Sequence, residues 1–563
     1  MTRNKEFSIV RQSGVLLKNY WVVPLSSLFS LWLIGPRNIS PSRYEWLWFG
    51  DLRAAQIQWE FFRATALFQF PIAGTPNYVR AEPHSLLFLF PFKLINPILP
   101  DNFQFMGFVV LVLFTLQAVA AQKLLGLFGL TTFQKNVASC FFVISPLLIF
   151  RTATMSHVML GGHFLILASI YLYWAGSNSI RNWTLVCLTL SFLDPYLLVV
   201  SLSVLGAHVC RESLQSPRKT LRMMQIAATV IVLVAASLGL QGYFSDPSSL
   251  QSSFSFRLNL AAFINPHFGP NQNFSVLMPH IGRVFDQSNI AEEQEGFGFV
   301  GFGVIVGAFF SAIWFSRNSQ KEDLKRAFPL VGVSLLWLYV ALSSEVALFR
   351  KQFNIPYPDF FDSFRSMFRG TPRFTVLLYY LILLFVVVGV SRIGKRYALL
   401  SVVLPLLVAI QIFDSYPGIM HAHEQISSEK IIVGGRDGAR LEEIGDSIKH
   451  LYVYPTYDFN SDYNSKMADY WIKDDRWYPL VMYAARNGVT SNFGYLARGD
   501  LKTTRAENSR VYRELTTGRL MPCSVYAVPG EAVWSSLKSS SILEDRAIFV
   551  DGYYLFLGPL GNC

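Results

Sequence analysis

Long apolar runs recur along this chain, and they constrain its fold more than any other feature. Several runs reach or approach the length of about 20 residues that an α-helix needs to cross a bilayer. Only 15% of the residues are charged, against roughly a quarter in soluble globular chains. A soluble core cannot bury so much contiguous apolar surface. The sequence therefore predicts an α-helical polytopic membrane protein.

The apolar runs predict eleven transmembrane helices. We place them at about 15–35, 104–130, 136–150, 158–175, 182–193, 196–210, 225–243, 298–315, 327–344, 374–391 and 398–413. The first run follows the basic residues Arg3, Lys5, Arg11 and Lys18, and no small-x-small cleavage site follows it. This pattern predicts an uncleaved first span and not a removable signal peptide.

The segment around Asp194-Pro195 is either a short hairpin between two spans or the kink of one long helix. With a cytoplasmic N-terminus, a hairpin places the basic clusters at 211–222, 317–326 and 392–396 inside the cell. A single kinked span would place all three clusters outside. Because basic residues favour the cytoplasmic side of a membrane, we expect the hairpin. The number of spans is then odd, and the C-terminus faces outward.

This topology gives four external regions, at about 36–103, 244–297, 345–373 and 414–563. The last is long enough for a domain of its own, and it alternates strand-like stretches with helix-like ones. We expect a transmembrane domain over 1–413, followed by an extracytoplasmic soluble α/β domain over 414–563. The predicted strands lie at 451–457 and 547–557 and a predicted helix at 440–450.

The five cysteines fall into two groups. Cys140, Cys187 and Cys210 lie inside apolar runs and are expected to be inert packing residues. Cys523 and Cys563 lie in the polar C-terminal region, where an oxidising compartment would allow a disulfide between them. No CxxC, HExxH or zinc-like spacing occurs in the sequence.

The formal net charge of +11 would favour nucleic-acid binding in a soluble protein. Here the Lys and Arg residues cluster in short loops between apolar runs, which is typical of membrane topology. We therefore expect membrane lipid and no nucleic acid as a partner.

The first external loop carries the strongest candidate for catalysis. Asp51 follows the aromatic run at 46–49 and begins a helix-like segment. It suits a helix N-cap or a general base that accepts the proton of a sugar hydroxyl, and the two roles can coexist. Arg53 and Glu60 in the same segment are candidate substrate-binding residues. Further along, Glu82 and His84 either order a substrate or form a solvated loop.

Two further candidates lie between the third and fourth predicted spans. Arg151 and His157 are ionisable residues near the outer membrane surface, and the planar guanidinium of Arg151 matches phosphate oxygens. The alternative for Arg151 is snorkelling to the interface. His163, in the next span, is either functional or a satisfied core histidine. Asp194 is a candidate substrate-binding residue or a simple turn residue.

The second and third external loops offer Arg257, Glu295, Arg365, Arg369 and Arg373. The last three arginines recur every four residues, which would place them on one face of a helix. Such a face would bind an anion, or it would be a solvated basic surface.

Four segments together resemble the GT-C superfamily of membrane glycosyltransferases, and more closely a family of bacterial multi-span membrane proteins of that outline. They are Gly50-Asp51 with 59–63, Arg151 through His157 with His163, Asp194 through Leu197, and Phe368 through Phe374. In this kind of hairpin a histidine is expected where Asp194 stands, so a family role for Asp194 is in doubt. The resemblance covers all the spans and continues into 492–498.

The resemblance implies an enzyme that takes a sugar from a polyprenyl-phosphate donor at the outer face of the bacterial inner membrane. Asp51 would be the base, with inversion at the anomeric centre. The residues Arg151, His157, Arg369 and Arg373 would hold the phosphate. The acceptor would be a cell-envelope glycan, such as lipopolysaccharide, or a lipid-linked molecule. Some relatives use a divalent metal, for which Asp51 and Glu60 could supply oxygens.

Three other functions compete with a transferase. A flippase or transporter would place charges inside several spans. A glycan polymerase would use the same arginines with two lipid-linked substrates. A non-catalytic receptor or assembly subunit would bind glycans through the aromatic residues at 470–478 of the tail, although these residues also suit a domain core.

Overall fold

The computed structural model describes most of the chain. The chain forms two compact units. The described residues are 19–47, 49–67, 86–214, 217–244, 256–269, 272–279, 295–318, 321–349, 351–428, 447–455, 477–492, 501–528, 530–538, 543–550, 552–560 and 563. The helical unit comprises 1–46, 102–237 and 255–428, and the mixed unit comprises 47–101, 238–254 and 429–563. The division predicted at residue 413 does not anticipate that 47–101 groups with the C-terminal residues.

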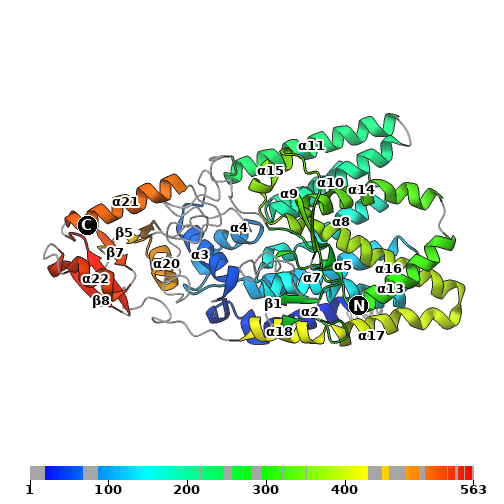
Figure 1. The fold of residues 1–563 in the computed structure, drawn as a ribbon, viewed down its shortest axis with the longest axis horizontal. Helices are drawn as coiled ribbons and strands as arrows, with labels where there is room; N and C mark the ends of the chain where they lie inside the picture. The colour runs from blue at the N-terminus through cyan, green and yellow to red at the C-terminus, as the bar shows by residue number, and fades with distance from the viewer. Residues whose placement is uncertain are drawn as a thin grey trace, which may run out of the picture. The chain divides into compact units, whose positions relative to one another are not determined.

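The helical unit is built from apolar helices that lie side by side (Figure 1). Its helices are α2 (Val22–Ile34), α5 (Met106–Gly126), α6 (Thr132–Val143), α7 (Pro146–Ile149), α8 (His163–Trp174), α9 (Ile180–Ser191), α10 (Pro195–Ser213), α11 (Pro217–Gln241), α13 (Phe302–Asn318), α14 (Lys321–Leu342), α15 (Phe360–Met367), α16 (Val376–Arg396), α17 (Val403–Asp414) and α18 (Tyr416–Ser427). Two short antiparallel hairpins join β1 (His267–Gly269) to β2 (Gln272–Asn273), and β3 (Glu345–Leu348) to β4 (Lys351–Asn354). Each of the predicted spans overlaps one of these helices.

Several of these helices are long and apolar enough to cross a membrane, so the structure indicates a membrane protein. Among the described residues, α5, α11, α14 and the segment Thr371–Arg396 that contains α16 meet this condition individually. Two bent pairs, α6 with 146–154 and 400–414 with α18, raise the number to 6 if each pair is one span. The predicted total of eleven spans stays a prediction.

Helices α9 and α10 form the predicted hairpin. The carboxylate of Asp194 caps α10 by accepting from the backbone N–H of Leu197 at 3.0 Å, and Pro195 at the first position suits a helix start. The two helices pack side by side, because Cys187 and Ser201 lie 3.7 Å apart. A single kinked helix would separate these two residues along its axis.

The basic turns of the helical unit meet at one end. The ammonium of Lys395, at the end of α16, donates to the carbonyl of Gly129 between α5 and α6 at 2.6 Å. The hydroxyl of Tyr173, at the end of α8, donates to the carbonyl of Arg326 in α14 at 2.5 Å. The end of α16, the turn between α5 and α6, the end of α8 and the first part of α14 therefore lie at the same end of the unit, with Arg326 and Lys395 among them.

Small polar residues let neighbouring helices approach closely. The hydroxyls of Ser169 on α8 and Ser201 on α10 lie 2.6 Å apart, and those of Ser191 on α9 and Ser237 on α11 lie 2.9 Å apart. All four side chains are buried or partly buried. Such contacts are typical of helix interfaces within membranes, where small residues and hydrogen bonds replace hydrophobic association.

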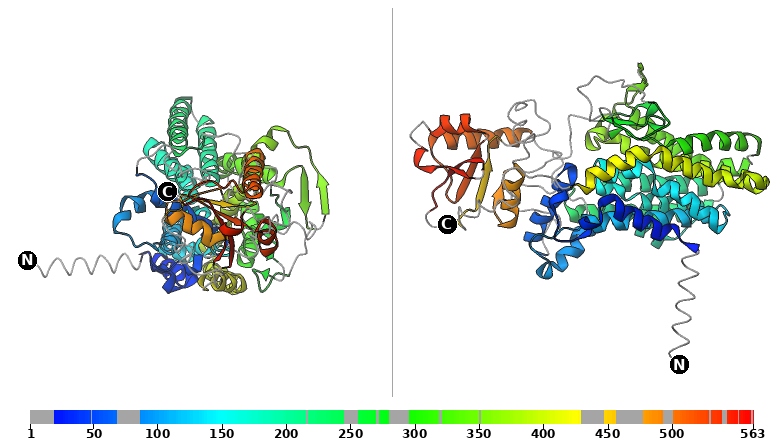
Figure 2. Two further views of the ribbon diagram at one scale, coloured as in Figure 1. Left: turned by 90° about the vertical axis from the view of Figure 1, so that its left-hand side faces the viewer. Right: turned by 90° about the horizontal axis from the view of Figure 1, so that it is seen from below.

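The mixed unit contains a five-stranded sheet with the order β6-β5-β7-β9-β8 (Figure 2). Its strands are β5 (His450–Val453), β6 (Thr490–Ser491), β7 (Ser524–Val528), β8 (Ala547–Val550) and β9 (Tyr553–Leu557), and its helices are α3 (Gly50–Ala64), α4 (Leu86–Leu94), α20 (Trp477–Arg486), α21 (Leu501–Thr517) and α22 (Glu531–Lys538). Strand β5 is parallel to β6 and β7, and β9 is antiparallel to β7 and β8.

A row of aromatic residues forms the core of this sheet. Tyr452, Tyr526 and Phe556 are direct partners on three adjacent strands, and Val511 and Leu515 of α21 belong to the same buried cluster. Strands and helices alternate here as the α/β prediction requires. The predicted strand at 547–557 is two strands, and most of the predicted helix at 440–450 lies outside the described residues.

The structure joins Cys523 and Cys563 in a disulfide, in the pairing predicted from the sequence. Cys140, Cys187 and Cys210 are free cysteines in the helical unit.

The buried carboxylate of Asp414 fixes the end of α17. It accepts from the backbone N–H of Leu277 at 3.0 Å, from that of Phe302 at 3.1 Å and from the hydroxyl of Ser275. These donors come from the segment after β2 and from the start of α13. Because the carboxylate is fully buried, its removal would leave buried donors without an acceptor.

We predict that Asp414→Ala destabilises the helical unit by about 3 kcal/mol, as expected for losing hydrogen bonds to a buried charged group. The measurement is the thermal unfolding temperature of the full chain in detergent. Asp359→Ala removes an exposed carboxylate that stands at the N-cap position of α15 but makes no cap hydrogen bond, and it serves as the matched control. Equal unfolding temperatures for the two variants would contradict the role of Asp414.

Candidate anion-binding site

A buried ion cluster lies at one end of the helical unit and consists of Arg151, His157, Glu295 and Arg373. The carboxylate of Glu295 accepts from Arg151 at 2.7 Å and from Arg373 at 2.5 and 3.0 Å. Arg151 also donates to the backbone carbonyl of Glu295. The ring nitrogen Nδ1 of His157 lies 3.8 Å from the same carboxylate. Four residues that the sequence nominated separately are thus brought together.

The backbone around Arg151 departs from a regular α-helix. Helix α7 continues into a π-helix over Phe150–Thr154, and Ser156 then adopts a positive φ of 57°. A π-helical turn and a left-handed non-glycine residue are both energetically unfavourable and are common at functional sites. This geometry directs Arg151 and His157 to the same carboxylate although a regular helix would place them on different faces.

Arg373 is positioned by the end of α15 and not by a long helix. Helix α15 ends at Met367, and a 3₁₀-helix, η9 (Thr371–Thr375), begins after Gly370. The prediction that Arg365, Arg369 and Arg373 share one helical face is therefore wrong. Gly370 and Pro372 interrupt the helix, because proline cannot continue an α-helical hydrogen-bond ladder.

The start of α10 completes the surroundings of Arg373. The guanidinium of Arg373 lies over the ring of Tyr196, 4.8 Å from its centroid, in a cation–π contact. The hydroxyl of Tyr196 accepts from the backbone N–H of Gly370 at 3.1 Å. Asp194, which caps α10, is buried beside Tyr196. Tyr196 was not predicted as a site residue from the sequence, although it lies in the segment Asp194 through Leu197 that carries the family resemblance.

The arginines keep Glu295 ionised. Burial by itself raises the pKa of Glu295, but Arg373, Arg151 and His157 lower it more, so the pKa lies well below the ordinary value of 4.5. The ion cluster thus sets two guanidinium cations against one carboxylate. Arg373 is the more accessible of the two, with 16% of its side chain exposed against 3% for Arg151.

Chemically, this arrangement can hold an anion. Two guanidinium groups that converge on one carboxylate also present the planar donor geometry that carboxylate and phosphate oxygens accept. Charged groups buried in this way are costly unless they are paired or serve a function.

Comparison with models of protein families shows to which family this chain belongs. A family model described as a domain of unknown function, DUF6311, matches residues 23–416. The chain belongs to the DUF6311 family. A second model, the DUF6311 C-terminal domain, matches residues 440–558. No curated protein and no solved structure matches the chain. The ion cluster lies entirely within the first DUF6311 match.

The predicted base, Asp51, belongs to the mixed unit and also lies within the first DUF6311 match. It occupies the first turn of α3, whose N-cap is Phe49 and has no side-chain cap. The interpretation of Asp51 as the N-cap is therefore wrong. A carboxylate in the first helical turn is still favoured by the helix dipole. Arg53 follows on the same helix, and Glu82 and His84 lie outside the described residues.

Glu60, on the same DUF6311 helix, is a buried carboxylate with polar neighbours. It accepts from Gln56 at 3.0 Å and lies 3.6 Å from Arg63 and 3.7 Å from Arg486 of α20. Burial raises the pKa of Glu60, and the two arginines only partly oppose this shift. Glu60 therefore packs α20 against α3, and its carboxylate is easier to protonate than an exposed one.

A metal shared by Asp51 and Glu60 does not fit the structure. The two residues stand about two and a half turns apart on α3, roughly 13 Å along its axis. Among the described residues, no group of three or more His, Cys, Asp or Glu side chains could hold a metal ion.

The remaining nominated residues have separate environments. Arg257 pairs with Glu345 of β3, and both side chains are partly exposed. The backbone carbonyl of Arg369 accepts from the N–H of Phe256 at 2.7 Å. His163 is a satisfied core histidine, because its ring nitrogen lies 2.8 Å from the hydroxyl of Tyr380 and both residues are buried.

We predict that Glu295→Gln destabilises the DUF6311 protein by about 3–5 kcal/mol at pH 7, since removing one partner of a buried ion pair leaves the other charges uncompensated. Because the pKa of Glu295 is lowered on folding, its stabilisation is fully present above about pH 4.5 and is lost as the pH falls through the folded-state pKa.

The measurement is the unfolding temperature of wild type and variant from pH 8 to pH 3. The difference in unfolding temperature between wild type and Glu295→Gln should be constant above the ordinary carboxylate pKa. It should become smaller at pH values below that pKa. Glu345→Gln, at a half-exposed position, is the matched control. A difference that shrinks as the pH rises towards 8 would contradict the account.

Proposed function

We propose that this DUF6311 protein is a membrane glycosyltransferase. It would move a sugar from a polyprenyl-phosphate donor to a cell-envelope glycan, such as lipopolysaccharide, or to a lipid-linked acceptor. The observation that carries the proposal is the pair of arginines, buried Arg151 and part-buried Arg373, held on Glu295 at one end of an apolar helical unit.

The proposed orientation follows from the two ends of the helices. Helix α16 begins just after Arg373 and ends at Lys395 and Arg396, and α10 begins beside Tyr196 and ends near Arg211. The ion cluster thus lies at the end opposite the basic turns. Because basic turns favour the cytoplasm, the ion cluster would face outward, with the disulfide of the mixed unit in the same oxidising compartment.

The ion cluster suits the phosphate of a lipid-linked donor. The polyprenyl chain would lie among the apolar helices, and its phosphate would lie at the level of the headgroups. Arginine donors fixed before the reaction stabilise the negative charge that develops on the leaving phosphate. Glu295 would hold Arg151 and Arg373 in position, and their cation–π and backbone contacts would limit movement on binding.

The proposed base is Asp51, on the strength of the resemblance to GT-C enzymes and of its place in the first turn of α3. A single displacement with one carboxylate base would invert the anomeric centre. Deprotonation of the acceptor hydroxyl by a positioned base contributes about 10²–10⁴-fold to the rate.

A flippase of lipid-linked glycans is the second candidate. The observation that favours it is that the ion cluster draws its charges from three separate segments of the helical unit, which is also expected of a transport site. Both functions require the arginines, but only the transferase requires a base. Substitution of Asp51 therefore distinguishes a transferase from a flippase.

We predict that Asp51→Asn and Arg373→Gln, introduced into the native host, both remove one sugar from the surface glycan and reproduce a deletion strain. The loss should be about a hundredfold or more for Asp51→Asn, because the proton acceptor is removed. The measurement is glycan composition by mass spectrometry at equal membrane abundance of the protein.

Two exposed residues provide matched controls, Asp101→Asn in the mixed unit and Arg317→Gln at the basic end of α13. Both should leave the glycan unchanged. Accumulation of the complete lipid-linked glycan, with a silent Asp51→Asn, would replace the transferase with the flippase. A deletion strain with every glycan intact would refute both.

A further inference from the structure

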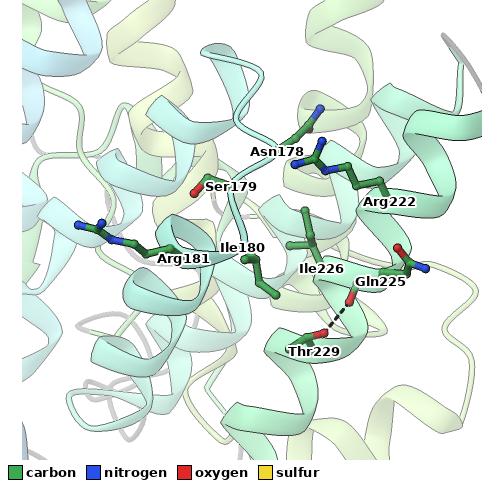
Figure 3. Close-up of a pocket in the computed structure, with 8 residues that line it drawn as sticks. All are labelled: Asn178, Ser179, Ile180, Arg181, Arg222, Gln225, Ile226 and Thr229. Atoms are coloured by element: carbon green, nitrogen blue, oxygen red, sulfur yellow. Dashed lines mark hydrogen bonds between the residues drawn. The ribbon is translucent and has the colours of Figure 1, made fainter.

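A surface pocket lies at the basic end of the helical unit, away from the ion cluster. Its volume is about 650 Å³, within the range of roughly 300–1,000 Å³ that is usual for small-molecule sites. The residues that line it are Asn178, Ser179, Ile180, Arg181, Arg222, Gln225, Ile226 and Thr229. They come from the start of α9 and the first half of α11 (Figure 3).

The pocket lies between the N-terminal parts of α9 and α11. Ser191 and Ser237 join the helices by a hydrogen bond of 2.9 Å near their C-terminal ends. At their N-terminal ends, residues 178–181 face residues 222–229 across the pocket. The pocket and the hairpin residue Asp194 therefore mark opposite ends of α9, roughly 18 Å apart along its axis.

Two cations at this pocket have no partner in the part of the chain that the structure describes. Arg181 and Arg222 are exposed and make no hydrogen bond or ion pair there, whereas nearby Arg211 pairs with Glu212 at 2.9 Å. Figure 3 shows Arg222 reaching from α11 towards Asn178, while the side chain of Arg181 points away from α11. The pocket thus has one arginine without a described partner on each of its two helices.

Both helices also carry apolar residues in and near the pocket. Ile180 and Ile226 line the pocket itself. On the same helices, Leu185 of α9 and Met224 and Ile231 of α11 are each more than half exposed. A ligand that fits both parts has an anionic head and long apolar chains.

We propose that this pocket binds the phosphate headgroup of an anionic phospholipid, with the acyl chains along α9 and α11. Guanidinium groups bind phosphate oxygens well, and basic residues at a membrane surface attract anionic lipids. The proposal does not depend on glycosyl transfer. It concerns a different end of the molecule, so its failure would leave the ion cluster untouched.

The experiment titrates the full chain in detergent with dioleoyl-phosphatidylglycerol or dioleoyl-phosphatidylcholine and counts bound lipids by native mass spectrometry. The test variant is Arg181→Gln/Arg222→Gln. The charge-matched control is Arg218→Gln/Arg317→Gln, two exposed arginines that do not line the pocket. All four positions are exposed, so the substitutions should leave the fold intact, which the unfolding temperature verifies.

We expect the test variant to bind the first phosphatidylglycerol about thirtyfold more weakly than wild type, and the control variant to match wild type. Binding of phosphatidylcholine should be the same in all three proteins. An equal loss of phosphatidylglycerol binding in the test and control variants would mean that general surface charge causes the effect. This result would overturn the proposal. Displacement of the lipid by millimolar inorganic phosphate would make the free anion the ligand, and the lipid assignment would fail.

Discussion

The carboxylate of Glu295 is the interaction on which one end of the helical unit, the end that holds the ion cluster, depends. Three segments that are far apart in the sequence, those of Arg151, Glu295 and Arg373, meet on it. A buried ion without partners is strongly unfavourable, and a well-bonded group of ions is not. The segments of Arg151 and Arg373 are therefore both held on Glu295, and removal of Glu295 would leave two guanidinium cations without their carboxylate partner.

The local geometry is consistent with this constraint. The π-helix over Phe150–Thr154 and the positive φ of Ser156 are both unfavourable by themselves. They place Arg151 and His157 against one carboxylate. Gly370 and Pro372 end α15 and allow Arg373 to turn inward over Tyr196. The hairpin of α9 and α10, capped by Asp194, in turn positions Tyr196.

The sequence predicted the helices well and the site only in part. Apolar runs locate helices because burial in lipid or in a helical core demands them, and the positive-inside rule chose the hairpin at Asp194 correctly. Pairing between distant segments leaves no periodic signal, so neither Tyr196 nor the convergence of Arg151 and Arg373 on Glu295 was predictable. The prediction that Arg365, Arg369 and Arg373 share one helical face was wrong, because it relied on their spacing of four residues. It did not take into account that Gly370 and Pro372 interrupt a helix. The grouping of 47–101 with the C-terminal residues depends on contacts such as Glu60 with Arg486, which no local pattern reports.

The central claim is that the ion cluster binds the phosphate of a polyprenyl carrier, and one comparison tests it directly. Purified protein in detergent is titrated with a polyprenyl phosphate and with the corresponding polyprenol, which has the same chain and no phosphate. The account predicts at least about tenfold tighter binding of the phosphate, and loss of that preference in Arg373→Gln. Equal affinity of the wild-type protein for the phosphate and the alcohol would contradict it.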